Sequence, residues 1–117
     1  MKFPHSARLL RRADFERVYK QGRRYFSQHM TVFCLQRAQG EGLRVGFTVS
    51  KMLGRAVQRN RVKRRLREAV RLEAVWNCAN VDIVINPKKT VATADFAVLK
   101  TEIRHAFDVI RKAADRH

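Results

Sequence analysis

Apolar residues recur at the three- and four-residue spacing of an amphipathic helix in three parts of the chain. The first predicted helix spans residues 9–21, and Gly22 supplies its stop. The second is entered through Gly54 and ends near residues 73–76. The apolar stripe of this second helix consists of Val62, Leu66, Ala69 and Val70. Because most of these side chains are small, the stripe favours packing against a sheet.

The third predicted helix lies in the last quarter of the sequence. Thr93 is a suitable N-cap for it, and its apolar stripe continues to Ala114. The members of this stripe are Phe96, Leu99, Ile103, Ala106, Phe107 and Ile110. A stripe of this width is typical of a helix that packs on a hydrophobic core.

The segments between the helices have the composition of β-strands. Residues 23–38 form an extended run rich in aromatic and β-branched side chains. Residues 43–50 alternate between apolar and polar positions, and the turn at 39–42 predicts that they form a hairpin with 23–38. This hairpin would have one open polar side, where Gly46 leaves room for an approach to the backbone. Residues 81–85 form a short apolar run, as expected of a central strand.

The predicted order of elements is helix, strands, helix, strand, helix. There is no internal repeat, linker or low-complexity tract, so residues 1–117 are expected to form one domain. The fold class that follows is α+β, a sandwich in which one sheet is backed by helices. Cys34 and Cys78 stand among apolar neighbours and are expected to be buried thiols, not a disulfide or a zinc site.

Charge changes the interpretation of the second helix. The chain has 26 Lys and Arg against 10 Asp and Glu, a formal net charge of +16, which gives salt-dependent affinity for nucleic acid. Residues 51–71 hold nine of these bases and a single acid, Glu68. Like charges four residues apart, such as Lys63 and Arg67, repel one another unless a polyanion lies against them. The helix is therefore predicted to bind nucleic acid with the face opposite its apolar stripe.

Motifs for catalysis by protein side chains are missing from the sequence. There is no zinc-protease or serine-hydrolase motif, no phosphate-binding glycine loop and no close pair of carboxylates. The four histidines show no metal-ligand spacing. No secretory segment or run of membrane-spanning length is present, so a cytoplasmic protein without membrane contact is expected.

The segment SKMLGRAVQRNRVKRRLREAVR (50–71) resembles the signature of the bacterial ribonuclease P protein subunit family. The matching positions are Ser50, Lys51, Gly54, Ala56, Val57, Arg59, Asn60, Arg61, Lys63, Arg64, Arg67 and Glu68. The segments ADFERVYKQGRR (13–24), RVGFTVSK (44–51) and VDIVINPKK (81–89) extend the similarity over nearly the whole chain. Met52 departs from the family, which more often has a second Lys there, so one phosphate contact is not carried over.

The resemblance implies a fold and an activity that composition does not reveal. The fold would be a ribosomal-protein-like α+β domain, with the basic helix in a left-handed crossover between parallel strands, against the usual right-handed rule. The chain would be the protein component of an endoribonuclease that cuts precursor tRNA at the mature 5′ end. Its partners would be the catalytic RNA and the precursor tRNA, with no protein partner required. Mg²⁺, held mainly by the RNA, would assist hydrolysis of the phosphodiester.

The resemblance also assigns site residues. Contacts to the catalytic RNA would come from Lys51, Arg55, Arg59, Asn60, Arg61, Lys63, Arg64, Arg65 and Arg67. The single-stranded 5′ leader of the substrate would contact Phe15, Tyr19 and Phe33, with Arg12 and Arg17 holding its phosphates. From the residues alone, Phe15 and Tyr19 are either core side chains or a surface on which unpaired bases stack. Two alternative functions remain open: a non-enzymatic RNA-binding protein of ribosomal type and a stand-alone nuclease.

Overall fold

The computed structural model describes residues 12–37, 42–73 and 80–115. Its elements are α1 (Arg12–Gln21), β1 (Arg23–Phe26), β2 (Met30–Gln36), β3 (Leu43–Phe47), η2 (Lys51–Leu53), α2 (Ala56–Glu73), β4 (Val81–Pro87), η3 (Lys89–Ala92) and α3 (Phe96–Asp115). The three predicted helices are all present, and the α+β class is confirmed. The predictions made for Cys78 and for most of the 39–42 turn lie outside the described residues.

The four strands form one sheet in the order β1-β2-β4-β3. β2 pairs antiparallel with both β1 and β4, whereas β3 pairs parallel with β4. β4 is therefore central, as predicted, because its residues 81–85 are buried on both faces of the sheet. The predicted hairpin between 23–38 and 43–50 is wrong. β4 inserts between these two segments, and 23–38 is itself a hairpin of β1 and β2, closed where Ser27 N donates to Met30 O over 3.0 Å.

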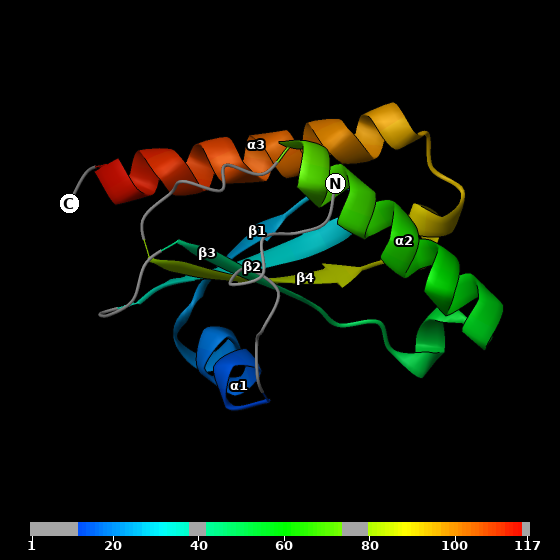
Figure 1. Ribbon diagram of the computed structural model, residues 1–117, viewed down its shortest axis with the longest axis horizontal. Helices are drawn as coiled ribbons and strands as arrows, with labels where there is room; N and C mark the ends of the chain where they lie inside the picture. Colours follow the sequence, from blue (N-terminus) through cyan, green and yellow to red (C-terminus); the bar gives the residue numbers. More distant parts are fainter. Residues whose placement is uncertain (1–11, 38–41, 74–79, 116–117) are drawn as a thin grey trace.

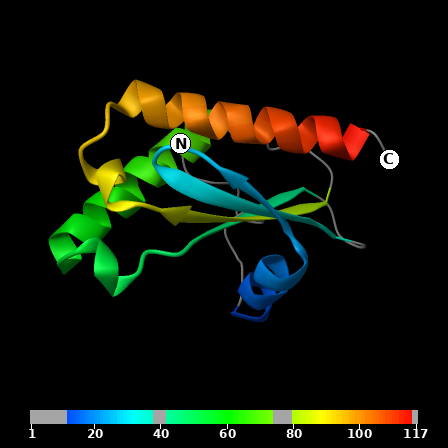
Figure 2. The same ribbon diagram turned by 180° about the vertical axis from the view of Figure 1, so that it is seen from behind.

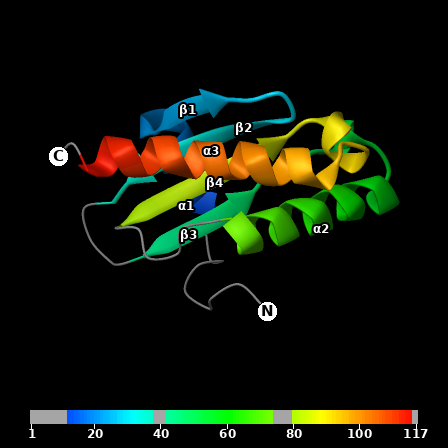
Figure 3. The same cartoon turned by 90° about the horizontal axis from the view of Figure 1, so that it is seen from above.

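Helices cover the two faces of the sheet unequally. α2 and α3 lie side by side on one face, and the shorter α1 lies on the other (Figure 1 and Figure 2). In Figure 3, where α2 is nearer the viewer than the sheet, the chain leaves β3, returns along α2 and enters β4 beside β3. This path makes the crossover between the parallel strands left-handed, in agreement with the fold that the resemblance implied.

The larger core lies between the sheet and the pair α2 and α3. The predicted stripes of both helices point into it: Val62, Leu66, Ala69, Val70, Leu99, Ile103, Ala106, Phe107 and Ile110 are all buried. The predicted N-cap of the third helix is wrong by two residues. Asp95, not Thr93, caps α3, since its Oδ1 accepts a hydrogen bond from Ala97 N over 3.0 Å.

A smaller core lies between α1 and the opposite face of the sheet. It consists of Val18, Phe33 and Val84, with Phe15 and Leu35 packed against it. α1, with 10 residues, is the only helix on this face among the described residues. None of the described helices is long and apolar enough to cross a membrane.

The chain turns sharply from α1 into β1 at Gly22. Gly22 N donates to Val18 O over 2.8 Å, and a Cβ here would lie 2.5 Å from Val18 O and 2.7 Å from Cys34 O. The predicted helix stop is therefore confirmed, but its reason is the close approach of two backbone segments, not a left-handed conformation.

Candidate nucleic-acid interface

A basic surface, which we call the outer face of α2, runs from η2 along the side of α2 that faces away from the sheet. The exposed predicted RNA contacts on this surface are Lys51 in η2, Arg55 just before α2, and Asn60, Arg61, Lys63, Arg64 and Arg67 within α2. Glu68, the one acid of residues 51–71, accepts a hydrogen bond from Arg71 Nε over 3.0 Å, and this bond holds the pKa of Glu68 below its ordinary value. This carboxylate is thus already engaged by an arginine of the same helix.

The start of α2 is capped by the side chain of Gln58. Gly54 has φ of +117°, which favours glycine, and the chain then enters the helix. Gln58 reaches back so that its Oε1 accepts a hydrogen bond from Arg55 N over 3.3 Å. A Cβ on residue 54 would collide with that same amide. The glycine and the glutamine therefore fix where the basic helix begins.

Two of the predicted RNA contacts also hold the fold together. Arg65 donates from Nη1 to Val91 O (3.0 Å) and Ala92 O (2.9 Å), and from Nη2 to Ala94 O. Arg61 Nε donates to Ala92 O over 2.8 Å. These bonds fasten α2 to the segment that leads into α3, a structural role that the sequence did not indicate.

Arg59 differs from its neighbours because it is half-buried. Its Nε is buried and has no hydrogen-bond partner within the described structure. Such a donor is costly to leave unpaired. Whether Arg59, Arg61 and Arg65 also contact RNA stays a prediction.

A second surface is formed by α1 and the side chains beside it on the same face of the sheet. The Tyr19 and Phe33 rings meet edge to face, with 4.8 Å between their centroids. The Tyr19 hydroxyl donates to Asn86 Oδ1 over 2.9 Å and accepts from Thr48 Oγ1 over 2.6 Å. We call Phe15, Tyr19, Phe33, Thr48 and Asn86 the aromatic face. Thr48 and Asn86 were not singled out in the sequence, because they become neighbours only when β3 and β4 pair.

The structure separates the three predicted leader aromatics by exposure. Phe33 is 9% exposed and belongs to the smaller core, Phe15 is half-buried against it, and Tyr19 is 38% exposed. Tyr19 is thus the ring of this surface that solvent reaches best. Arg12 is exposed near Glu16 (3.9 Å), and Arg17, also exposed, lies 3.4 Å from the buried Asp14.

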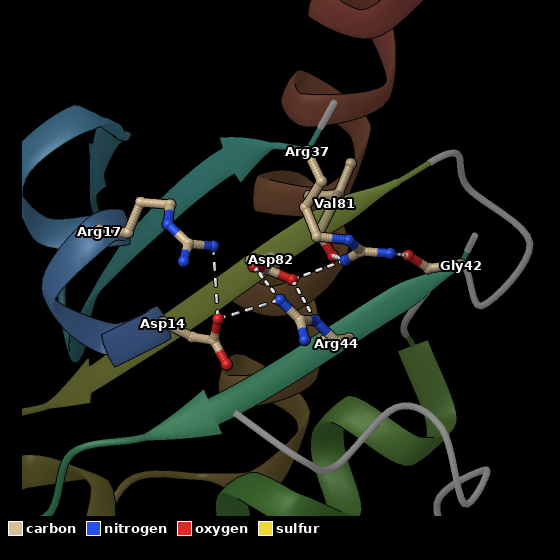
Figure 4. A network of polar contacts seen from close by, with 7 residues as sticks. All are labelled: Asp14, Arg17, Arg37, Gly42, Arg44, Val81 and Asp82. Carbon is tan, nitrogen blue, oxygen red and sulfur yellow. Dashed lines mark hydrogen bonds and ion pairs between the residues drawn. The ribbon is translucent and has the colours of Figure 1, made fainter. Parts of the chain in front are cut away.

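A buried ionic network fixes α1 against the sheet (Figure 4). Asp82 is fully buried in β4 and accepts from Arg37 Nη1 over 2.6 Å and from Arg44 over two bonds of 2.7 Å each. Arg44 Nη2 also lies 3.3 Å from Asp14 of α1, which in turn pairs with Arg17. The bond to Asp82 raises the pKa of Arg44. The signal in the sequence for this network was Asp82, a single acid inside the apolar run 81–85. An acid buried in such a strand must be paired.

The described residues contain no group of three or more His, Cys, Asp or Glu side chains that is arranged to hold a metal ion. Cys34 packs against the larger core but is half-buried, not fully buried as expected.

A basic helix on one side of the sheet and an aromatic face on the other define an α+β domain of the RNA-binding class. Comparison with known proteins then specifies the family: a sequence profile described as Ribonuclease P matches residues 3–111. The chain belongs to the ribonuclease P protein family.

Relatives and solved structures agree with this assignment. The ribonuclease P protein component of Geobacter sp. (strain M21) is 42% identical over 111 residues, which are 94% of this chain and 93% of the relative. The Staphylococcus aureus RNase P protein has a TM-score of 0.75 at 26% identity, covering 89% of this chain and 94% of that one. The Thermotoga maritima RNase P protein has a TM-score of 0.73 at 26% identity, covering 86% of this chain and 94% of that one. The predicted family and fold are confirmed.

Proposed function

We propose that this ribonuclease P protein component binds the catalytic RNA of the enzyme through the outer face of α2. The observation that carries the proposal is the run of exposed bases above a fully buried apolar stripe. The buried stripe anchors the helix, so its guanidinium groups are presented on a rigid support. Arginine suits this role because its planar fork bonds phosphate oxygens in pairs.

The aromatic face is proposed to bind the single-stranded 5′ leader of precursor tRNA. Tyr19 offers a partly exposed ring, and its hydroxyl is held by Thr48 and Asn86, so the ring is oriented before any base arrives. Stacking of a base on an aromatic ring tolerates any base, as an enzyme with many substrates requires. α1 and α2 lie on opposite faces of the sheet, which lets the two RNAs be bound together.

The protein residues are proposed to position RNA, while the hydrolysis itself uses Mg²⁺ held mainly by the catalytic RNA. The carboxylates beside the two surfaces do not suit a metal ion, because arginines already bond them. Glu68 is paired with Arg71, Asp14 with Arg17 and Arg44, and Asp82 with Arg37 and Arg44. The side chains of this chain therefore contribute phosphate neutralisation and leader contacts.

The test is cleavage of a 5′-labelled precursor tRNA at low Mg²⁺ by the protein alone, a bacterial ribonuclease P RNA alone, and both together. We expect cleavage at the mature 5′ end only when the protein and the RNA are both present, or far more efficient cleavage in that mixture than with either alone. No further protein should be required. Cleavage by the protein alone would make it a nuclease. Tight RNA binding with no effect on cleavage would favour a non-enzymatic RNA-binding protein.

A further inference from the structure

Phe26 is the most exposed aromatic side chain among the described residues. It is 75% exposed and lies on β1, the edge strand of the sheet. The guanidinium carbon of Arg24 lies 5.8 Å from the centroid of the Phe26 ring, a cation–π distance. The ring therefore has one cationic neighbour and is otherwise largely open to solvent.

Strand register places Phe26 on the same side of the sheet as the aromatic face. Tyr25 pairs with Val32 and packs on the larger core, so its neighbours Arg24 and Phe26 point to the opposite side. Phe26 pairs with Thr31, and Thr31 pairs with Asn86 of the aromatic face. Two strand spacings, about 10 Å, separate Phe26 from Asn86.

Positive charge surrounds this ring. Lys88 Nζ lies 3.5 Å from the carbonyl oxygen of Ser27, the residue after Phe26, and Arg24 stands over the ring itself. An exposed apolar ring on an edge strand ordinarily favours pairing with another protein chain. Here the two cations and the net charge of +16 oppose approach of a second copy and attract phosphate. A polyanion with exposed bases fits this surface better than a protein does.

We propose that Phe26 and Arg24 form a second stacking position for single-stranded RNA at the β1 edge. This position takes a leader nucleotide beyond those held at the aromatic face: Phe26 stacks on the base, and Arg24 and Lys88 neutralise neighbouring phosphates. The inference rests on the proposed binding of the leader and extends it across the full width of the sheet. Like the aromatic face, this position is tolerant of base identity.

The experiment measures the dissociation constant of the reconstituted ribonucleoprotein for precursor tRNAs whose leaders increase in length one nucleotide at a time. Variants Phe26→Ala, Phe26→Leu and Phe26→Tyr are compared with Val98→Ala, a control that removes a partly exposed apolar side chain from α3. We expect Phe26→Ala and Phe26→Leu to bind long leaders about fivefold or more weakly. Short leaders should be bound equally by all variants, and Phe26→Tyr should behave as the unmodified protein does.

A fluorescent adenine analogue, 2-aminopurine, locates the position on the leader. Its quenching should be lost in Phe26→Ala at one leader nucleotide and kept at those nearer the tRNA body. If the unmodified protein shows no dependence on leader length, leader binding fails altogether, and this inference with it. If that dependence is present but unchanged in Phe26→Ala, or retained in Phe26→Leu, the stacking position alone is wrong. A change in sedimentation of Phe26→Ala without a leader effect would make the edge a protein contact.

Discussion

Arg44 and Asp82 form a bidentate ion pair across the parallel strands β3 and β4. Arg44 Nε lies 2.7 Å from Asp82 Oδ1, and Arg44 Nη2 lies 2.7 Å from Asp82 Oδ2. Asp82 is fully buried and also bonds Arg37, while Arg44 reaches Asp14 of α1. The Asp82 carboxylate of β4 thereby holds Arg44 of β3 and Arg37, the residue after β2. Through Arg44 it is also linked to α1, the helix that carries Tyr19.

Replacing Asp82 with Ala should lower the free energy of unfolding by about 3–5 kcal/mol, because two guanidinium groups would lose the carboxylate that pairs with them. Urea denaturation at fixed salt and sulfate concentration measures the change. Asp108→Ala is the matched control, since Asp108 pairs with Arg111 at 3.6 Å on an exposed helix face and should cost under about 1 kcal/mol. Equal, small losses for both variants would show that the network does not stabilise the fold.

The double variant Arg64→Ala with Arg67→Ala should weaken binding to the catalytic RNA and flatten its salt dependence. Each lost phosphate contact should change the log–log slope of affinity against salt by about 0.7–0.9. Filter binding over a series of salt concentrations measures the slope. Arg111→Ala, a charge removed from α3, should leave the slope unchanged, and an unaltered slope in the double variant would mean that those two side chains do not touch RNA.

Tyr19 allows its ring and its hydroxyl to be tested separately. Tyr19→Phe removes the bonds to Thr48 and Asn86 and should lower the free energy of unfolding by about 1 kcal/mol while keeping leader binding. Tyr19→Leu also removes the stacking ring and should cost about 1–3 kcal/mol in binding of precursor tRNA. Mature tRNA, which lacks the leader, serves as the reference ligand. If Tyr19→Leu weakened binding of precursor and mature tRNA equally, Tyr19 would be a core residue without a role in leader binding.

Two glycines should respond to substitution in different ways. Gly22→Ala should destabilise the fold by about 1–3 kcal/mol, because its Cβ would overlap two backbone carbonyl oxygens. Gly42 has φ of +80° and open space around it, so Gly42→Asn should be tolerated better than Gly42→Ala. Gly22→Asn should destabilise the fold at least as much as Gly22→Ala does. Thermal unfolding of the four variants would reveal the contrast, and a benefit from Asn at position 22 would contradict it.

The pair of Glu73 and Arg104 joins α2 to α3, with Arg104 Nε 3.0 Å from Glu73 Oε2. The hydrogen bonds from Arg104 lower the pKa of Glu73. A lowered carboxyl pKa adds stability at pH values above the unfolded pKa, and this stability is lost as pH falls through the folded value. Glu73→Gln should therefore be less stable than the unmodified protein at pH 7. The difference should shrink as pH falls below the unfolded pKa of about 4.3 and vanish only below the lower folded pKa. A constant difference across this range would exclude the ionic contribution.

Much of the architecture was predictable from local patterns. The apolar stripes of α2 and α3 were predicted residue by residue, because helical periodicity depends only on neighbours along the chain. The basic outer face of α2 followed from the same periodicity. The single N-cap error, Thr93 for Asp95, arose because both residue types cap helices, whereas Thr93 instead ends the η3 turn as its C-cap.

Strand pairing is where prediction failed. The sequence suggested a hairpin between neighbouring segments, but β4 is buried on both faces and takes the central place between β2 and β3. This insertion brings Asn86 beside Thr48 and under the Tyr19 hydroxyl, and Asp82 between Arg37 and Arg44. The same insertion aligns Phe26 of β1, Thr31 of β2 and Asn86 of β4 across the sheet.

The sequence by itself determined the helices, their buried stripes, the charge that selects a nucleic acid and the family to which the chain belongs. Tertiary structure decided which strand lies between which, where the left-handed crossover puts α2, and which arginines serve the fold. The physical reason is the range of each interaction. Periodicity and charge act between residues a few positions apart, whereas ion pairs, ring contacts and strand register join residues that meet only after the sheet has formed.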